Sequence, residues 1–93
     1  MKDPIIDLIH VISNRKKNLP KGSYTAALFK AGLNKICKKV DEESKEVVGA
    51  AKHETKKRLI EESVDLIYHL LVLLAAKDIK WAEIQKEIKN RRK

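Results

Sequence analysis

The sequence predicts an all-α fold: a bundle of four to five helices in a single domain that spans residues 1–93. The composition is 43% hydrophobic and 37% charged but only 4% aromatic, with three glycines and two prolines, a balance that favours helices over strands and turns. Apolar residues recur at helical spacing, and no alternating stretch is long enough to predict a strand. A lone domain of this length buries only about 60–65% of its unfolded surface, so we expect an oligomer.

The first predicted helix begins at Asp3, which can cap it, with Pro4 in the first helical position. Apolar residues then recur at helical spacing until about Asn14. A basic loop over residues 15–22 is expected to follow, because the apolar pattern stops there and proline and glycine interrupt it.

Two further helices follow this loop. Ser23 is a good N-cap for a short helix over 24–31, and Gly32 suits its C-terminal end. Asn34 is the expected cap of the next helix, over about 35–52. One stripe of this helix is apolar and is bordered by acidic side chains. The stripe consists of Ile36, Val40, Val47 and Ala50.

The fourth helix is predicted from about Thr55 to Lys77. It begins amphipathic but is apolar on nearly every side over residues 66–76, so this segment must be covered all round. We therefore expect the long helices of two subunits to pair into a homodimer. A fifth helix over about 81–91 repeats apolar residues on one face and ends in cations, which suit a helix C-terminus.

Lysine and arginine total 21 against 13 acidic residues, and the net charge of +8 attracts polyanions. Nucleic acid, anionic lipid and multiply phosphorylated small molecules all fit this charge. A nucleic-acid binder is one hypothesis, but the basic residues are spread along the chain without a recognition motif, and few aromatics are present for stacking. The apolar run 66–76 is shorter than the roughly 20 residues that span a bilayer, so we expect no membrane span.

A cytoplasmic location is expected. The N-terminal residues 1–11 lack the uninterrupted apolar segment of a secretory signal. The single cysteine, Cys37, cannot form an internal disulfide, which suits a reducing compartment. Its position on the apolar flank of the third helix predicts a small core residue.

Two acidic pairs at helical spacing, Glu43 with Glu46 and Glu62 with Asp65, are the most informative pattern in the chain. If antiparallel helices bring the pairs together, neighbouring carboxylates about 5 Å apart repel by roughly 3 kcal/mol at an effective dielectric of about 20, and a cation is needed. Carboxylate oxygens suit Mg²⁺, which is usually shared with substrate phosphates. The alternative is a solvated face with ordinary ion pairs to nearby lysine and arginine.

Several polar residues are candidates for substrate binding. Lys39 lies beside the acids and, with Lys35, could neutralise phosphate, although both could equally be solvated. Ser23 and Thr25 could bind phosphate at a helix N-terminus, or simply cap it. His69 could donate to phosphate or support another residue, but a histidine among leucines is more often a hydrogen-bonded core residue.

The acidic pairs belong to a longer pattern. EESKE over residues 42–46, followed after 15 residues by ESVD over 62–65, resembles the EExxE…ExxD signature of the MazG-like all-α nucleotide pyrophosphohydrolases. Within that superfamily, SYTA over 23–26 and DLIYHLLVLLA over 65–75 are similar to the phosphoribosyl-ATP pyrophosphohydrolase family. The resemblance covers residues 19–92 and implies a MazG-like bundle completed by homodimerisation.

The resemblance also implies an activity and roles for individual residues. The activity is magnesium-dependent hydrolysis of phosphoribosyl-ATP to phosphoribosyl-AMP and pyrophosphate, the second step of histidine biosynthesis. Glu42 would support the ligands or the base. Asp41 stands where the family usually has glycine, and could change metal affinity or loop geometry. The implied Mg²⁺ ligands are Glu43, Glu46, Glu62 and Asp65.

Two other hypotheses use the same residues differently. A nucleotide pyrophosphohydrolase that cleanses the nucleotide pool would share the metal site and differ only in its purine and ribose contacts. A purely structural interaction module would need no magnesium-stimulated release of pyrophosphate. An assay for that product therefore separates the enzymes from the module.

Overall fold

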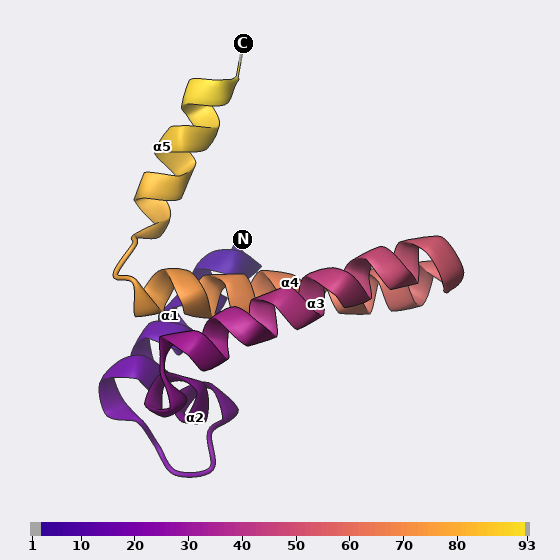
Figure 1. The fold of residues 1–93 in the computed structure, drawn as a ribbon. Coiled ribbons are helices and arrows are strands. Elements are labelled where there is room, and N and C mark those ends of the chain that lie inside the picture. Colours follow the sequence, from indigo (N-terminus) through magenta and orange to yellow (C-terminus); the bar gives the residue numbers. More distant parts are fainter. Residues whose placement is uncertain (1–2, 93) are drawn as a thin grey trace.

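The computed structural model describes residues 3–92, and the described chain folds into helices without a strand. Figure 1 shows the five helices, with α3 and α4 forming a long antiparallel hairpin and α1 and α2 packed at one end of it. The all-α prediction is confirmed. The helices are α1 (Pro4–Asn18), α2 (Tyr24–Ala31), α3 (Leu33–His53), α4 (Lys56–Ala76) and α5 (Trp81–Arg91).

Helix α1 begins as predicted and ends later than predicted. Asp3 accepts a hydrogen bond from the amide of Ile5 at 2.9 Å, and Pro4 is the first helical residue. The predicted end at Asn14 is wrong, because basic residues at 15–17 continue the helix as its last turn. Lysine and arginine have good helix propensity, and their charge is favourable near the negative end of the helix dipole. The chain leaves the helix at Leu19, which has a φ of 47°.

Helices α2 and α3 share Gly32 as their junction. Ser23 caps α2 by accepting from the amide of Ala26 at 3.1 Å, as predicted. Gly32 has a φ of 99°, which an L side chain rarely adopts, so one residue ends α2 and begins α3. The predicted cap Asn34 is wrong, because it lies inside α3, and Gly32 supplies no side-chain cap.

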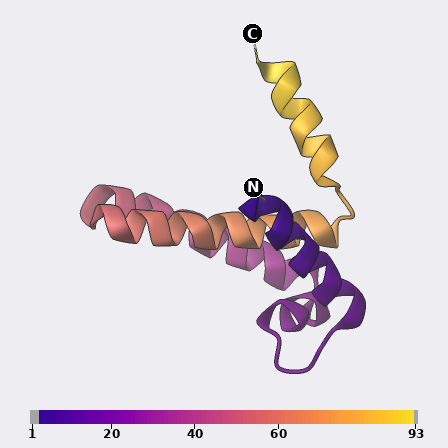
Figure 2. The same ribbon diagram turned by 180° about the vertical axis from the view of Figure 1, so that it is seen from behind.

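The hairpin turns at Thr55, whose hydroxyl accepts from the amide of Arg58 at 3.2 Å and so caps α4. Figure 2 shows the same pairing of α3 and α4 from behind. The core lies where α1 and α2 cover one end of the hairpin. Its buried hydrophobic residues are Ile12, Leu28, Ile36, Leu71 and Val72.

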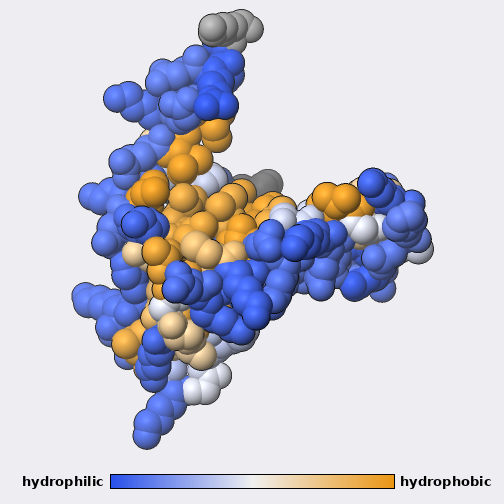
Figure 3. Space-filling model, viewed as in Figure 1, coloured by the Kyte–Doolittle hydropathy of each residue, from blue (hydrophilic) through white to orange (hydrophobic). Residues whose placement is uncertain are grey.

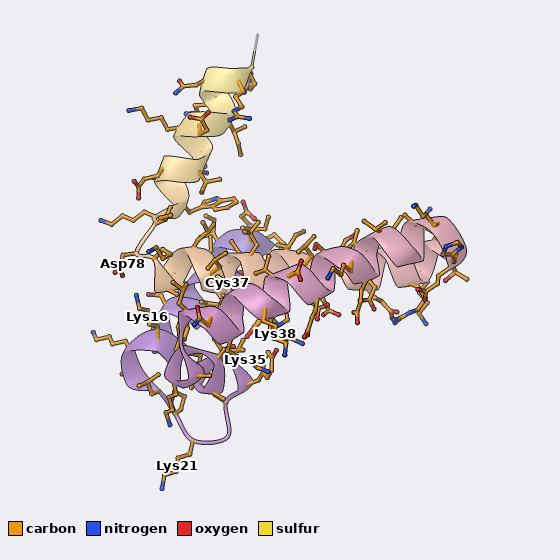
Figure 4. The ribbon with its side chains drawn as sticks, in the orientation of Figure 1. Lys16, Lys21, Lys35, Cys37, Lys38 and Asp78 are labelled. Atoms are coloured by element: carbon orange, nitrogen blue, oxygen red, sulfur yellow. The ribbon has the colours of Figure 1, made fainter. Side chains whose placement is uncertain are left out.

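Cys37 is exposed, so its prediction as a core residue is wrong. Successive residues on a helix are rotated by about 100°, and Ile36 takes the buried position while Cys37 turns outward. Figure 4 labels Cys37 on α3.

Helix α5 extends away from the other four helices in both views (Figures 1 and 2). Its first residue, Trp81, packs against the core, whereas Ile88 further along is 53% exposed. A hollow of about 340 Å³ lies between α1, the end of α4 and the start of α5. Figure 3 shows apolar residues gathered around the place where α5 leaves the body. Within residues 3–92, no helix is both long and apolar enough to cross a membrane.

Candidate metal centre and active site

Three of the four predicted ligands meet between α3 and α4. One carboxylate oxygen each from Glu43, Glu62 and Asp65 lies within 4.8 Å of the other two. Glu43 comes from the middle of α3, and the other two lie one turn apart on α4. The antiparallel hairpin therefore brings Glu43 of the first acidic pair against both members of the second pair.

Two of these carboxylates are buried in an unusual way. Glu43 and Glu62 are only 7% and 5% exposed, and within residues 3–92 no group donates a hydrogen bond to the buried Oε2 atom of either. A buried unpaired carboxylate oxygen is costly, and such groups normally pair or coordinate a metal. Carboxylate oxygens are the ligands that Mg²⁺ prefers, and these residues would hold it. The donor set therefore fits a hard divalent cation.

Glu46 lies beside this cluster rather than within it. Its side chain is exposed, and its carboxylate lies close to that of Glu62. A proton shared with Glu46, together with desolvation and the negative charge of Glu46, raises the pKa of Glu62, while the positive charge of Arg58 opposes the rise. The acids thus repel each other enough to hold a proton more tightly, which is the crowding that a cation would relieve.

Two cations border the acids. The Lys39 ammonium lies 3.3 Å from Glu42 and 3.5 Å from Glu43. Partial burial works to lower the pKa of Lys39, but the hydrogen bond to Glu42 and the nearby Tyr24 and Glu43 outweigh it, so the pKa rises. Arg58 donates to Glu62 at 2.5 Å. Part of the ion-pair alternative is therefore also present in the structure.

The other acidic residues near the signature have distinct positions. Glu42 accepts from Lys39 and does not join the cluster of three, a position that suits a supporting role. Asp41 is exposed and pairs with Lys45 at 3.2 Å. Because residue 41 lies inside α3, the loop-geometry alternative for Asp41 is excluded, and an effect on metal affinity stays a prediction.

The predicted phosphate contacts on α2 and α3 are placed as follows. The Ser23 hydroxyl caps α2, and Thr25 is buried with 6% exposure. Lys35 is exposed in the first half of α3, and Figure 4 shows it near Lys38. Their roles toward phosphate stay predictions.

His69 is buried, with 6% exposure, and both ring nitrogens have protein partners. Nδ1 lies 2.7 Å from the backbone oxygen of Asp65, and Nε2 lies 2.8 Å from the Tyr24 hydroxyl. This is the hydrogen-bonded core position that the sequence left open as an alternative. Tyr24 was not among the residues predicted from the sequence, where its only signal is its place in the SYTA stretch.

Comparison with known proteins identifies the family. A family model described as phosphoribosyl-ATP pyrophosphohydrolase matches residues 5–92. The chain belongs to this family. A protein named phosphoribosyl-ATP pyrophosphatase from Listeria monocytogenes is 58% identical over 85 residues, which cover 91% of this chain and 82% of the relative. A protein of the same name from Clostridium botulinum is 49% identical over 92 residues, covering 98% and 84%.

The similarity also extends over whole chains. A phosphoribosyl-ATP pyrophosphatase from Metallosphaera sedula is 44% identical over 93 residues, which is the full length of both proteins. Proteins of the phosphoribosyl-ATP pyrophosphohydrolase family are hydrolases, so the chain is an enzyme of that class. The resemblance read from the two acidic pairs and the SYTA stretch is confirmed.

Proposed function

We propose that the protein hydrolyses phosphoribosyl-ATP to phosphoribosyl-AMP and pyrophosphate with Mg²⁺, as the second step of histidine biosynthesis. The observation that carries the proposal is the convergence of Glu43, Glu62 and Asp65, with two buried oxygens that receive no hydrogen bond from the described part of the chain. The names of the relatives supply the substrate. A cytoplasmic location fits a soluble nucleotide substrate.

The metal would be held by these three acids, with Glu46 beside them as the fourth ligand. Bound there, Mg²⁺ polarises phosphoryl oxygens, stabilises the departing pyrophosphate and acidifies or orients an attacking water. We do not require a covalent intermediate, because direct attack by water on the α-phosphorus is sufficient.

The side chains around the acids would supply the remaining chemistry. A carboxylate oxygen that is not a metal ligand accepts the proton of the attacking water. As the water oxygen bonds to the α-phosphorus, the bond between the α-phosphorus and the bridging oxygen breaks. The Lys39 ammonium lies 3.5 Å from Glu43, so its positive charge would face the triphosphate. Glu42 holds the Lys39 ammonium in place from 3.3 Å.

Further phosphate contacts are proposed at the start of α2 and on α3. Tyr24, the first residue of α2, lies 2.8 Å from His69, which in turn lies 2.7 Å from the backbone oxygen of Asp65. The N-terminus of α2 therefore lies beside the acidic site, and its amides near Ser23 and Thr25 favour an anion. Lys35, one turn before Lys39, would add a second cation.

We also propose a homodimer. The supporting observation is a row of exposed apolar residues on α4, between 43% and 57% exposed, on the helix that the sequence predicted must be covered all round. The row consists of Ile60, Val64, Ile67 and Leu70.

The test is a pyrophosphate-release assay on phosphoribosyl-ATP, ATP and dUTP, each with and without Mg²⁺. We expect release that depends on Mg²⁺ and is fastest with phosphoribosyl-ATP. Equal rates on all three nucleotides would defeat the narrow substrate and leave a general nucleotide pyrophosphohydrolase. If no pyrophosphate is released from any of the three nucleotides, the proposed enzymatic activity is contradicted.

A further inference from the structure

A chain of two hydrogen bonds links α2 to the acidic site. The Tyr24 hydroxyl lies 2.8 Å from His69 Nε2, and His69 Nδ1 lies 2.7 Å from the backbone oxygen of Asp65. The ring of Tyr24 is also fixed by its neighbours: it stands edge-on to His69 at 5.8 Å between ring centroids and lies 6.4 Å from Tyr68.

The direction of these hydrogen bonds follows from their acceptors. A backbone carbonyl oxygen can only accept, so Nδ1 of His69 carries a proton. In the neutral ring Nε2 then has a lone pair, and the Tyr24 hydroxyl must donate to it. The tautomer is assigned here from these partners. The proton of Tyr24 is therefore committed to the protein interior.

The outer side of the Tyr24 hydroxyl can consequently only accept a hydrogen bond. Tyr24 is 53% exposed, whereas His69 beneath it is 6% exposed, so Tyr24 can meet a ligand on the side that faces away from His69. A phosphate oxygen is also an acceptor and does not suit this position. The complementary group is a hydroxyl or an amino group of the ligand.

The neighbourhood favours a hydroxyl of the sugar. The Tyr24 hydroxyl is joined through His69 to the backbone of Asp65, which belongs to the cluster proposed to hold the triphosphate through Mg²⁺. In a nucleotide the group attached directly to the α-phosphate is the ribose, whereas the amino group of the base lies further away.

We propose that Tyr24 is a substrate-binding residue whose hydroxyl oxygen accepts a hydrogen bond from a ribose hydroxyl of the nucleotide, with His69 as the positioning residue that fixes its direction. This inference rests on the proposed function. It assigns to the sugar a contact at the start of α2, beside the phosphate contacts.

The main test compares Tyr24→Phe with the control Tyr68→Phe. Both variants lose one hydroxyl from the same aromatic cluster, but Tyr68 lies outside the Tyr24–His69–Asp65 chain. Loss of one neutral hydrogen bond should raise the KM for phosphoribosyl-ATP about 3- to 10-fold in Tyr24→Phe, with kcat within about twofold. Tyr68→Phe should leave both unchanged. An unchanged KM in Tyr24→Phe would overturn the proposal.

The source of the donor is tested with AMP, 2′-deoxy-AMP and 3′-deoxy-AMP as inhibitors. Tyr24→Phe should weaken inhibition by AMP. It should not change inhibition by the deoxy analogue that lacks the contacted hydroxyl. Equal weakening of all three would overturn the ribose contact in favour of the amino group. If the native protein releases no pyrophosphate from phosphoribosyl-ATP, the proposed function fails instead, and the binding of AMP still tests the contact.

The positioning role of His69 is tested with His69→Phe, judged first by its melting temperature and helical circular dichroism. In a folded variant the Tyr24 hydroxyl no longer donates to residue 69, so KM should rise as it does in Tyr24→Phe. The double variant that carries both substitutions should have a KM no higher than that of either single variant. Additive effects would contradict the linkage. If His69→Phe does not fold, Tyr68→Phe and Tyr24→Phe still decide the proposal.

Discussion

The carboxylates of Glu43 and Glu62 are packed in a way that costs stability without a cation. Each has one oxygen near a basic side chain and a second oxygen that is buried without a hydrogen-bond donor among the described residues. Burial without a hydrogen bond destabilises the charged form, and the raised pKa of Glu62, caused first by a proton shared with Glu46 and then by burial, reflects the same crowding. Such local cost is typical of residues kept for function rather than for stability.

Replacing Glu43 with glutamine should therefore separate activity from folding. The amide keeps the shape but loses a charged metal ligand, so turnover of phosphoribosyl-ATP should fall at least ~100-fold. Mg²⁺ should raise the melting temperature of the native protein, because it binds the folded state, and this rise should be lost in Glu43→Gln. Pyrophosphate release and thermal unfolding measure the two effects. The same loss of turnover is expected for Glu46→Gln, Glu62→Gln and Asp65→Asn.

Asp41→Asn is the matched control for these variants. Asp41 lies two residues before Glu43 on the same helix, but it is exposed and pairs with Lys45. A surface ion pair of this kind contributes little, so turnover and the Mg²⁺-induced rise in melting temperature should be unchanged. Near-normal turnover in two of the four acid variants would show that the ligand assignment is wrong.

At the same scale, the sequence could predict the acidic pairs but not their partners in space. Spacing of three residues places Glu62 and Asp65 on one face of a helix by geometry alone. Which acid of α3 comes closest depends on the register of α3 against α4, and there Glu43 rather than Glu46 meets them. The contact between Tyr24 and His69 joins residues 45 apart, and no local pattern encodes it.

At the scale of elements, the predicted boundaries were accurate where a residue has a specific capping role. Ser23 and Thr55 accept from backbone amides at the starts of α2 and α4, and both starts were predicted within a residue. The end of α1 was missed because a basic run carries no apolar pattern, although it is stable as a last helical turn. Where a helix ends because one residue adopts a positive φ, that residue could be predicted from the sequence only if it was glycine.

Gly32 and Gly49 offer a matched test of this point. Gly32 has a φ of 99°, whereas Gly49 lies inside α3, and an added Cβ meets no atom within 4 Å at either position. Gly32→Ala should therefore destabilise the fold by about 1 kcal/mol through backbone strain alone. Gly49→Ala should stabilise it by about 0.5–1 kcal/mol, because alanine has the higher helix propensity. Urea unfolding measures both changes in the free energy of unfolding, and changes of the same sign in the two variants would contradict the junction geometry.

Lys16 connects α1 to the end of α4. Its ammonium donates to the backbone oxygen of Ala75 and to the carboxylate of Asp78, each at 2.7 Å. It therefore satisfies a free carbonyl at a helix C-terminus and places a cation there, where the helix dipole favours it. Asp78 has a φ of 57°, and the chain turns there toward α5.

This contact predicts a pH dependence. The hydrogen bond and charge of Lys16 lower the pKa of Asp78 below its ordinary value of 3.8. A lowered pKa in the folded state contributes stability above the unfolded value, and that contribution is lost as pH falls through the folded value. Asp78→Asn tolerates the positive φ but has no charge. The stability difference between native protein and variant should be small and constant above about pH 5, and should shrink below about pH 4.

Urea unfolding of both proteins between about pH 3 and pH 7 measures this difference. The effect is small because the Asp78 side chain is 86% exposed. A difference that stays flat below pH 4, or grows there, would show that the charge of Asp78 does not stabilise the turn.

At the scale of the whole molecule, α4 presents two opposite faces. A rotation of about 100° per residue places Glu62, Asp65 and His69 on one side, and the exposed row that contains Ile67 on the other. Near the end of α4, α1 covers part of the apolar face, where Leu71 is buried. The first half of that face is left open in a single chain. The apolar composition of residues 66–76 predicted that this part of α4 must be buried. It did not predict which part of the apolar face the same chain buries.

A second copy would cover this open face without blocking the acidic site. Ile67→Lys places a charge in the exposed row, where Ile67 is 43% exposed in one chain. If two α4 helices pair there, burying an unpaired ammonium is costly, and the variant should be monomeric where the native protein is dimeric.

Leu33→Lys is the control, because Leu33 is also 43% exposed but lies at the start of α3. Light scattering at matched concentrations should show a dimer for the native protein and Leu33→Lys and a monomer for Ile67→Lys. A native protein that stays monomeric at high concentration would contradict the dimer, and a dimeric Ile67→Lys would move the interface to another face.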